Sequence, residues 1–298
     1  MDSDIKIVAV VVTYNRLNLL RECLATFYSM ELRPIKVIII DNASTDGTSE
    51  YLKTFKSDSL FEIIRLNMNV GGAGGFSTGI RCAMQYDCDG IWLMDDDTIP
   101  QWDSLKFLCR TLLHDKTIGF ACSRVIWTDG SDHEMNRPYF ISKNDSNETI
   151  REIESASFVS IVIRKSIVSR IGLPYKEFFI WDDDSEYTQR ITKNNYKGKY
   201  VSNSIVVHKT PWNYGPSISN APVATAWKFY YGQRNAMFMN RQRYGSGLKF
   251  YIKELNHLRL ALHNVNKRKH NERSIFRKEI LRGFLDGLTF NPKIDYIQ

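Results

Sequence analysis

Two apolar stretches near the N-terminus decide the fold: IKIVAVVVTYN (residues 5–15) and VIIID (residues 37–41). Both are rich in β-branched residues, and the chain between them carries apolar side chains at helical spacing. Such strands, joined by a helix, are typical of a parallel sheet covered on both faces. Ligands bind beyond the carboxyl ends of these strands, so we expect Thr13, Asn15 and Asp41 to line one crevice. The alternative interpretation of Asp41 is a plain turn with a helix cap.

The alternation of strands and helices continues to residue 126 and then becomes less regular. Further strands are predicted at residues 61–66, 91–94, 119–127, 153–163 and 200–207. Helices are predicted at residues 17–30, from 44 or 45 to 55, at 75–86 and at 184–193. Residues 128–149 are polar and predict a loop, and from residue 221 the pattern is helical and basic. We therefore expect an α/β domain over residues 1–215 and a basic helical region over residues 216–298.

The composition excludes a disordered chain, because 43% of the 298 residues are hydrophobic. The net charge is +7, but residues 241–298 contain 13 basic and 5 acidic residues, so the remainder is close to neutral. The five cysteines form no C-x-x-C pair, which favours a reducing, cytoplasmic setting over a disulfide framework or structural zinc site. We find no targeting signal and no apolar stretch of membrane-spanning length, so a soluble or peripheral protein is expected.

A glycine-rich stretch, NVGGAGGFSTG (residues 69–79), leads from a predicted strand into a predicted helix. Glycines let a backbone approach a phosphate closely, and a helix N-terminus favours negative charge. The stretch lacks the last glycine of a dinucleotide fingerprint and the Lys-Ser/Thr pair of a P-loop. It therefore indicates a phosphate contact of a different kind or, alternatively, a flexible turn.

Two acidic clusters follow apolar stretches: WLMDDD (residues 92–97) and FFIWDDDSEY (residues 178–187). Adjacent carboxylates repel one another, and a divalent cation or sugar hydroxyls relieve that cost. The second cluster lies at a predicted helix start, where acids complement the dipole, and it can supply a general base beside an aromatic platform. The alternatives are a solvated acidic turn and an ordinary helix start. His208 follows a predicted strand, and a lone histidine is more often structural than a ligand.

Taken in order, these motifs resemble the family 2 glycosyltransferases, which are inverting enzymes of the GT-A fold. The series is VVTYNR (11–16), DNASTDG (41–47), the glycine-rich stretch, DDD (95–97) as the D-x-D element, and WDDDSE (181–186). The resemblance covers about residues 5–210. It implies a GT-A fold, an α/β architecture with a Rossmann-like mixed sheet flanked by helices, followed here by a C-terminal helical extension.

The resemblance also implies a donor and metal site. The residues that would bind the nucleotide-sugar donor are Thr13, Asn15, Arg16, Asp41, Asn69, Gly72, Asp95 and Asp96. Within this set, Asp95 would contact the ribose or the metal, and Asp96 the donor sugar. Asp97 and His208 would hold Mn²⁺ or Mg²⁺, because His208 occupies the position of the family's late metal-binding histidine.

By motif position the implied catalytic base is Asp184, and Asp183 is the alternative because three aspartates run together. Trp181, Asp183 and Glu186 would bind the acceptor. The implied reaction is a single in-line displacement, in which the base deprotonates an acceptor hydroxyl that attacks the anomeric carbon. The cation would neutralise the leaving nucleoside diphosphate.

The glycine-rich stretch and the second acidic cluster look most like the branch that includes bacterial galactofuranosyltransferases. This resemblance implies UDP-galactofuranose as donor, with dTDP-rhamnose as the alternative because rhamnosyltransferases are closely related. Related rhamnosyltransferases tend to carry other residues where Gly72 and Phe76 lie. The implied acceptor is a bacterial cell-surface glycan or a polyprenyl-diphosphate-linked oligosaccharide.

In the C-terminal region, basic residues are interleaved with apolar ones. This pattern predicts amphipathic helices that attach to an anionic membrane, on the inner face of the bacterial cell membrane. An ordinary solvated helical face is the alternative. A nucleic-acid binder is disfavoured because the rest of the chain is near neutral and carries no such motif. A catalytically inactive sugar-nucleotide-binding module is a further alternative of a different class.

Overall fold

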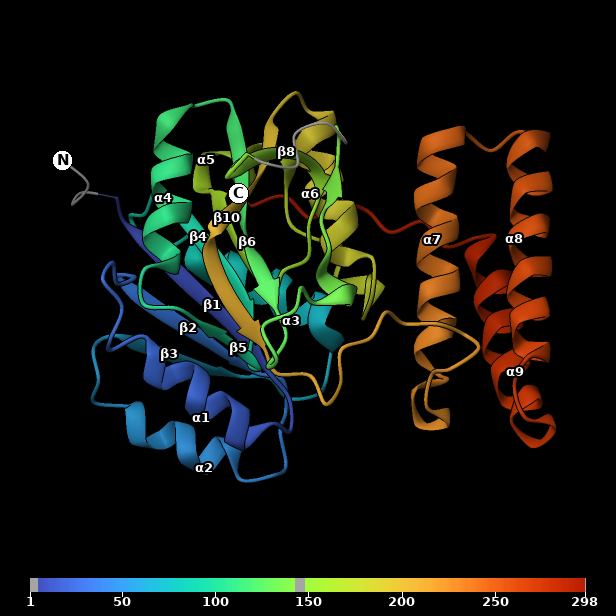
Figure 1. Cartoon of the computed structure of the whole chain (residues 1–298), viewed down its shortest axis with the longest axis horizontal. Coiled ribbons are helices and arrows are strands. Elements are labelled where there is room, and N and C mark those ends of the chain that lie inside the picture. Colours follow the sequence, from blue (N-terminus) through green and yellow to red (C-terminus); the bar gives the residue numbers. More distant parts are fainter. Residues whose placement is uncertain (1–4, 143–147, 298) are drawn as a thin grey trace. The chain divides into compact units, whose positions relative to one another are not determined.

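The computed structural model describes residues 5–142 and 148–297, and the chain divides into two compact units (Figure 1). The N-terminal unit comprises Met1–Lys176, Asp184–Tyr214 and Ile294–Gln298, and the C-terminal unit comprises Glu177–Asp183 and Gly215–Lys293. The domain boundary at residue 215 stays a prediction. Nothing in the sequence predicts that residues 177–183 group with the C-terminal helices.

A mixed sheet forms the centre of the N-terminal unit and has ten strands in the described part of the chain. Its order is β3-β2-β1-β4-β9-β6-β10-β8-β7, and β5 pairs with β10. The strands are β1 Ile7–Thr13, β2 Lys36–Asp41, β3 Phe61–Arg65, β4 Gly90–Asp95, β5 Thr98–Pro100, β6 Ile118–Ile126, β7 Tyr139–Phe140, β8 Ile150–Ser155, β9 Ser160–Arg164 and β10 Lys197–His208. Strands β3, β2, β1 and β4 are parallel, whereas β9 is antiparallel to β4 and β6. The mixed sheet of the predicted fold class is confirmed.

Helices connect and cover the strands. In the N-terminal unit they are α1 Leu17–Thr26, α2 Thr48–Leu52, α3 Gly71–Ala83, α4 Ser104–His114, α5 Lys165–Ile171 and α6 Asp183–Lys193, of which Asp183 itself groups with the C-terminal unit. The C-terminal unit contains α7 Lys228–Tyr244, α8 Leu248–Asn266 and α9 His270–Gly287. Short 3₁₀ turns are η1 Lys53–Phe55, η2 Glu134–Asn136, η3 Lys176–Phe178 and η4 Val223–Thr225.

Strand β1 is the centre of the core, and all seven of its residues are buried. Because side chains alternate along a strand, Val8 and Val10 join the apolar cluster that contains Phe76 of α3. Ala9 and Val11 join the cluster on the other face, with residues of α1 and α4. This two-sided burial explains why the β1 sequence is apolar without alternation.

The glycine-rich stretch is the first part of helix α3 and not a loop, so the predicted helix start at residue 75 is wrong. A Cβ atom added to Gly75 would lie 2.5 Å from Val12 Cγ1, and one added to Gly79 would lie 2.3 Å from Val10 Cγ1. These two glycines therefore let α3 pack closely against β1. Gly72 differs from them, because open space surrounds its added Cβ.

Two other expectations need correction. The single strand predicted at residues 153–163 is two strands, β8 and β9, interrupted at residues 156–159. The backbone N–H of Ala156 bonds to Thr188 Oγ1 of α6 (3.2 Å) and not to a neighbouring strand. The predicted loop at residues 128–149 contains η2 and β7, and its residues 143–147 lie outside the described part of the chain.

In the C-terminal unit, α7 holds the segment 177–183 through buried polar groups. Asn235 is fully buried and donates from Nδ2 to the carbonyl oxygens of Phe178 (3.0 Å), Ile180 (3.2 Å) and Trp181 (3.0 Å). Phe179, Trp181 and Asp182 in this segment have φ near +65°, a conformation that costs energy in non-glycine residues. The bonds from Asn235 offset that cost. In the described part of the chain, no helix is both long and apolar enough to span a membrane.

We expect Gly79→Ala to destabilise the protein by about 1–3 kcal/mol, because the new methyl group overpacks the contact with Val10. The matched control is Gly72→Ala, whose methyl group enters open space in the same helix and changes stability by less than about 1 kcal/mol. Denaturant unfolding of the three proteins measures both effects. Equal midpoints for the two variants would contradict the proposed role of Gly79.

Candidate active site

The acidic cluster lies where β4 ends, and strand pairing brings His208 to it. Asp95 is the last residue of β4, and Asp96 and Asp97 form the turn into β5. Strand β5 is antiparallel to β10, with Thr98 opposite His208. The backbone N–H of Lys209 donates to the carbonyl oxygen of Asp97 (2.9 Å). Two motifs that are far apart in the sequence therefore meet at one end of the sheet.

Asp95, Asp97 and His208 can together offer ligand atoms to one metal ion, since these atoms lie within 4.8 Å of one another. Asp97 and His208 are buried. Asp97 Oδ1 lies 3.0 Å from His208 Nε2 but is a buried oxygen without a hydrogen bond of normal geometry from the described residues. Two carboxylates and an imidazole suit Mn²⁺, and carboxylates alone suit Mg²⁺. The predicted metal ligands thus form a set that fits a divalent cation.

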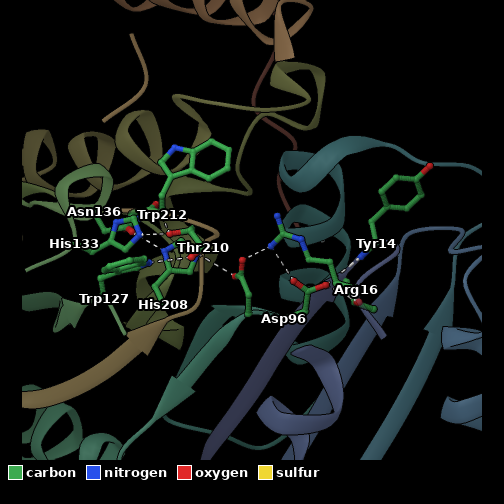
Figure 2. A network of polar contacts seen from close by, with 12 residues as sticks. Tyr14, Arg16, Asp96, Trp127, His133, Asn136, His208, Thr210 and Trp212 are labelled. Atoms are coloured by element: carbon green, nitrogen blue, oxygen red, sulfur yellow. Dashed lines mark hydrogen bonds and ion pairs between the residues drawn. The ribbon is translucent and has the colours of Figure 1, made fainter. Parts of the chain in front are cut away.

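Asp96 and Asp97 share the cationic partner Arg16, as Figure 2 shows for Asp96. The Arg16 guanidinium lies 3.4 Å from Asp96 Oδ1 and also contacts Asp97 Oδ2. Thr13 Oγ1 donates to Asp96 Oδ2 (2.7 Å), so the end of β1 is tied to the turn after β4. Thr13, Arg16 and Asp96, all predicted as donor-binding residues, lie together.

Burial and neighbouring charges shift the pKa values of the three carboxylates to different extents. Burial and the charge of Asp97 raise the pKa of Asp95 to about 6. Burial also raises the pKa of Asp96 to about 7, although Arg16 opposes the shift. For Asp97 the upward effect of burial is outweighed by His208 and Arg16, and its pKa is lowered. Asp97 is therefore the carboxylate of the three that is most firmly anionic, as a metal ligand must be.

Asp41 lies at the end of β2, and each of its carboxylate oxygens accepts a hydrogen bond from the protein. Its Oδ1 accepts from the Ser44 backbone N–H (2.8 Å) and its Oδ2 from Arg65 Nη1 (2.5 Å). Asn15, whose φ is +53°, accepts at Oδ1 from the Thr45 N–H (2.7 Å). Thr13, Asn15 and Asp41 thus line one edge of the sheet, with Arg65 as a neighbour that the sequence motifs did not include.

Asn69 organises the start of α3. Its Oδ1 accepts from the Gly71 N–H (2.8 Å) and from Asn42 Nδ2 (3.0 Å). The side chain therefore fixes the turn before the helix, next to Gly72. The backbone at Gly72 has open space beside it, so a ligand can approach this position more closely than the packed glycines farther along the helix.

Asp184 belongs to the N-terminal unit and lies in the first turn of α6. Burial raises its pKa, although the Ser185 N–H donates to its Oδ1 (2.6 Å) and opposes the shift. Its charge also contributes to the raised pKa of Asp95. Asp184 is therefore within electrostatic reach of the acidic cluster, and its raised pKa suits a group that accepts a proton.

The three predicted acceptor residues have different surroundings. Glu186 forms a two-bond ion pair with Arg190 (2.6 and 3.1 Å), whose guanidinium also donates to backbone carbonyls. Trp181 belongs to the C-terminal unit, where its ring packs edge-on against Phe229 at 5.1 Å. Asp183, in the same unit, is buried.

Three side chains around His208 were not predicted from the sequence. Asn136 Oδ1 lies 2.8 Å from His208 Nδ1, and the His133 ring is 4.7 Å from the His208 ring (Figure 2). His133 in turn contacts Thr210 Oγ1 at 2.8 Å. Burial, with the adjacent His208, lowers the pKa of His133 to about 4. His133 and Asn136 lie in the polar stretch that predicted only a loop, and no pattern there indicates their role.

Comparison with known proteins matches the family model described as glycosyl transferase family 2 to residues 8–172, more than half of the chain. The galactofuranosyltransferase GlfT1 of Mycolicibacterium smegmatis is 25% identical over 198 residues, which are 62% of this chain and 65% of that protein. The poly-beta-1,6-N-acetyl-D-glucosamine synthase of Staphylococcus aureus is 22% identical over 241 residues, 78% of this chain and 52% of that protein. The chain thus spans between half and two thirds of the length of these relatives.

Solved structures share the fold at low sequence identity. The mannosyltransferase PcManGT of Pyrobaculum calidifontis, in complex with GDP-Man and Mn²⁺, has a TM-score of 0.59 at 16% identity, over 95% of this chain and 87% of that chain. S. aureus TarS 1–349 in complex with UDP has a TM-score of 0.57 at 14% identity, over 94% and 90% of the two chains. These similarities confirm the predicted GT-A fold.

We expect the protein to bind Mn²⁺, and Asp97→Asn to weaken that binding at least about tenfold, because an anionic ligand is lost. Titration calorimetry with Mn²⁺ alone measures the affinity. The control is Asp87→Asn, which neutralises an exposed carboxylate paired with Lys6 and leaves the affinity unchanged. Equal affinities of Asp97→Asn and the unmodified protein would exclude this metal site.

Proposed function

The chain belongs to glycosyl transferase family 2, and on this premise we propose that it is a metal-dependent inverting glycosyltransferase. The observation that carries the proposal is the meeting of Asp97 and His208 at 3.0 Å, with Asp184 within electrostatic reach of the same cluster. Asp97 and His208 are suited to hold a cation, and Asp184 is suited to accept a proton.

In the proposed reaction, the Asp184 carboxylate takes the proton of an acceptor hydroxyl, and the resulting oxygen attacks the anomeric carbon of the donor. The bond from that carbon to the nucleoside diphosphate breaks as the new glycosidic bond forms, so the configuration inverts. Asp183 is the alternative base. Mn²⁺ or Mg²⁺ held by Asp97 and His208, with Asp95 beside them, would supply charge neutralisation for the diphosphate.

The donor would lie along the edge formed by the ends of β1, β2 and β4. We assign nucleotide binding to Thr13, Asn15, Arg16, Asp41, Asn69 and Gly72, and sugar or ribose contacts to Asp95 and Asp96. Arg16 is suited to the diphosphate because a guanidinium binds phosphate oxygens in pairs. We assign the acceptor to Trp181, Asp183 and Glu186, and the oxygens of Glu186 retain lone pairs for hydroxyl donors beside the Arg190 bonds.

We propose UDP-galactofuranose as the donor, with dTDP-rhamnose as the second candidate. The motifs of the glycine-rich stretch support galactofuranose, as does the relative named galactofuranosyltransferase. A cell-surface glycan or a polyprenyl-diphosphate-linked oligosaccharide is the proposed acceptor. The relative named for synthesis of a glucosamine polymer supports a glycan acceptor in general.

We also propose that the C-terminal unit binds the cytoplasmic face of the cell membrane. One face of α8 exposes Leu248 (77%), Ile252 (60%) and Leu255 (57%) at helical spacing, with Lys249 and Arg259 also exposed on the helix. Exposed apolar side chains flanked by basic ones match an anionic lipid surface, because the apolar side chains insert among the lipids and the basic ones are attracted to the headgroups.

A panel of donors tests the proposed activity. We expect transfer or slow hydrolysis with UDP-galactofuranose in the presence of Mn²⁺, and none with UDP-galactopyranose. Asp184→Asn should bind UDP as the unmodified protein does but lose about 10²–10⁴-fold in rate, since general base catalysis contributes that much.

Asp183→Asn is the matched variant, and a larger loss there than in Asp184→Asn would move the base to Asp183. Turnover of dTDP-rhamnose without turnover of UDP-galactofuranose would identify dTDP-rhamnose as the donor. Binding of donors without any turnover would favour a sugar-nucleotide-binding module over an enzyme.

We expect the protein to sediment with anionic phosphatidylglycerol vesicles at low salt, and to be released at high salt because the charge attraction is screened. The triple variant Leu248→Ser, Ile252→Ser and Leu255→Ser should remain in the supernatant. Met68→Ser removes a similarly exposed apolar side chain (67%) from the N-terminal unit and serves as control. Sedimentation of the triple variant at the unmodified level would contradict the assignment of this face.

A further inference from the structure

A chain of polar contacts leads from His208 away from the candidate metal position (Figure 2). His208 Nε2 faces Asp97 Oδ1 at 3.0 Å, and on the other side of the ring Nδ1 lies 2.8 Å from Asn136 Oδ1. The Asn136 amide then donates from Nδ2 to Ser157 Oγ (3.0 Å). His208 and Asn136 are 5% and 8% exposed, so solvent does not readily replace these partners.

The contacts of Asn136 determine what each ring nitrogen of His208 does. In the structure Nδ2 of Asn136 faces Ser157, and its carbonyl oxygen, which only accepts hydrogen bonds, faces His208 Nδ1. Nδ1 of His208 must therefore carry the hydrogen in this contact. A neutral imidazole has one N–H and one lone pair, so loss of the Nε2 proton leaves that nitrogen with the lone pair that a metal ion requires.

Without the contact to Asn136, the His208 ring could adopt the other tautomer. Asp97 is a carboxylate acceptor 3.0 Å from Nε2, and it favours the tautomer whose hydrogen lies on Nε2, where it blocks a metal ion. Asn136 is the counterpart at Nδ1 among the described residues. The His133 ring, 4.7 Å away and tilted by 33°, packs against His208 and restricts reorientation of its plane.

We propose that Asn136 is a positioning residue that fixes His208 with the Nε2 lone pair toward the metal position. The inference rests on the metal site of the proposed function but concerns a different residue. Partners at the second nitrogen of a ligating histidine commonly change metal affinity by 10–100-fold. Asn136 is the last residue of η2, a short turn in the polar stretch at residues 128–149.

Mn²⁺ binding to the full chain tests the proposal by calorimetry and by pulsed electron paramagnetic resonance, which detects the coupling of an imidazole nitrogen to Mn²⁺. Asn136→Leu removes the acceptor at similar volume and should weaken Mn²⁺ binding about 10–100-fold. At saturating Mn²⁺ its nitrogen coupling should be lost, as in His208→Ala. Asn136→Asp keeps an oxygen acceptor and should retain both the affinity and the coupling.

Asn240→Leu is the matched control, since it removes an amide that donates to Glu254 (2.8 Å) in the C-terminal unit. Thermal unfolding shows whether each variant is folded, and Asn136→Asp supplies the test if Asn136→Leu is not. The proposal would be overturned if Asn136→Leu kept the Mn²⁺ affinity and nitrogen coupling of the unmodified protein. It would also be overturned if a folded Asn136→Asp lost both. Either result would leave the metal site intact. Absence of Mn²⁺ binding by the unmodified protein would instead overturn the metal site, and this inference with it.

Discussion

The feature on which the site depends is the crowding of three successive carboxylates, Asp95, Asp96 and Asp97, at the end of an apolar strand, with Asp96 and Asp97 buried. Crowded negative charge in a poorly solvated position is unfavourable unless it is paired. Two of them share Arg16 and differ in their second partner: Asp96 also contacts Thr13, and Asp97 also contacts His208. The result is a set of carboxylates with different proton affinities, in which the pKa of Asp97 is lowered and that of Asp96 is raised.

The mixed sheet brings those neighbours to the carboxylates. Its parallel half places the end of β1, and therefore Thr13 and Arg16, beside the end of β4. The antiparallel pairing of β5 with β10 carries His208 to the other side of the same turn. A wholly parallel sheet would supply the first set of partners but not this route to the second. The change in strand direction is therefore what completes the candidate metal site.

Local patterns predicted the elements whose role is local. Apolar runs located β1 and β4, and the acidic residues after them were visible in the sequence as site candidates. The start of α3 was mispredicted because glycine can serve either a turn or close packing of a helix. At Gly79 it allows close packing against Val10, which only the folded structure reveals. Asn136 was missed because its significance is a 2.8 Å contact with a residue 72 positions away, and a polar residue in an irregular stretch carries no sign of that partner.

We propose that Asp97 and His208 hold a divalent cation where the donor binds, at the ends of β1, β2 and β4. Crystals grown with UDP and Mn²⁺ and measured at the manganese absorption edge test it most directly, because anomalous scattering locates the metal independently of the protein. We predict one strong peak within bonding distance of Asp97 and His208 Nε2, adjacent to the diphosphate. Bound UDP without a manganese peak at these two side chains would contradict this metal site.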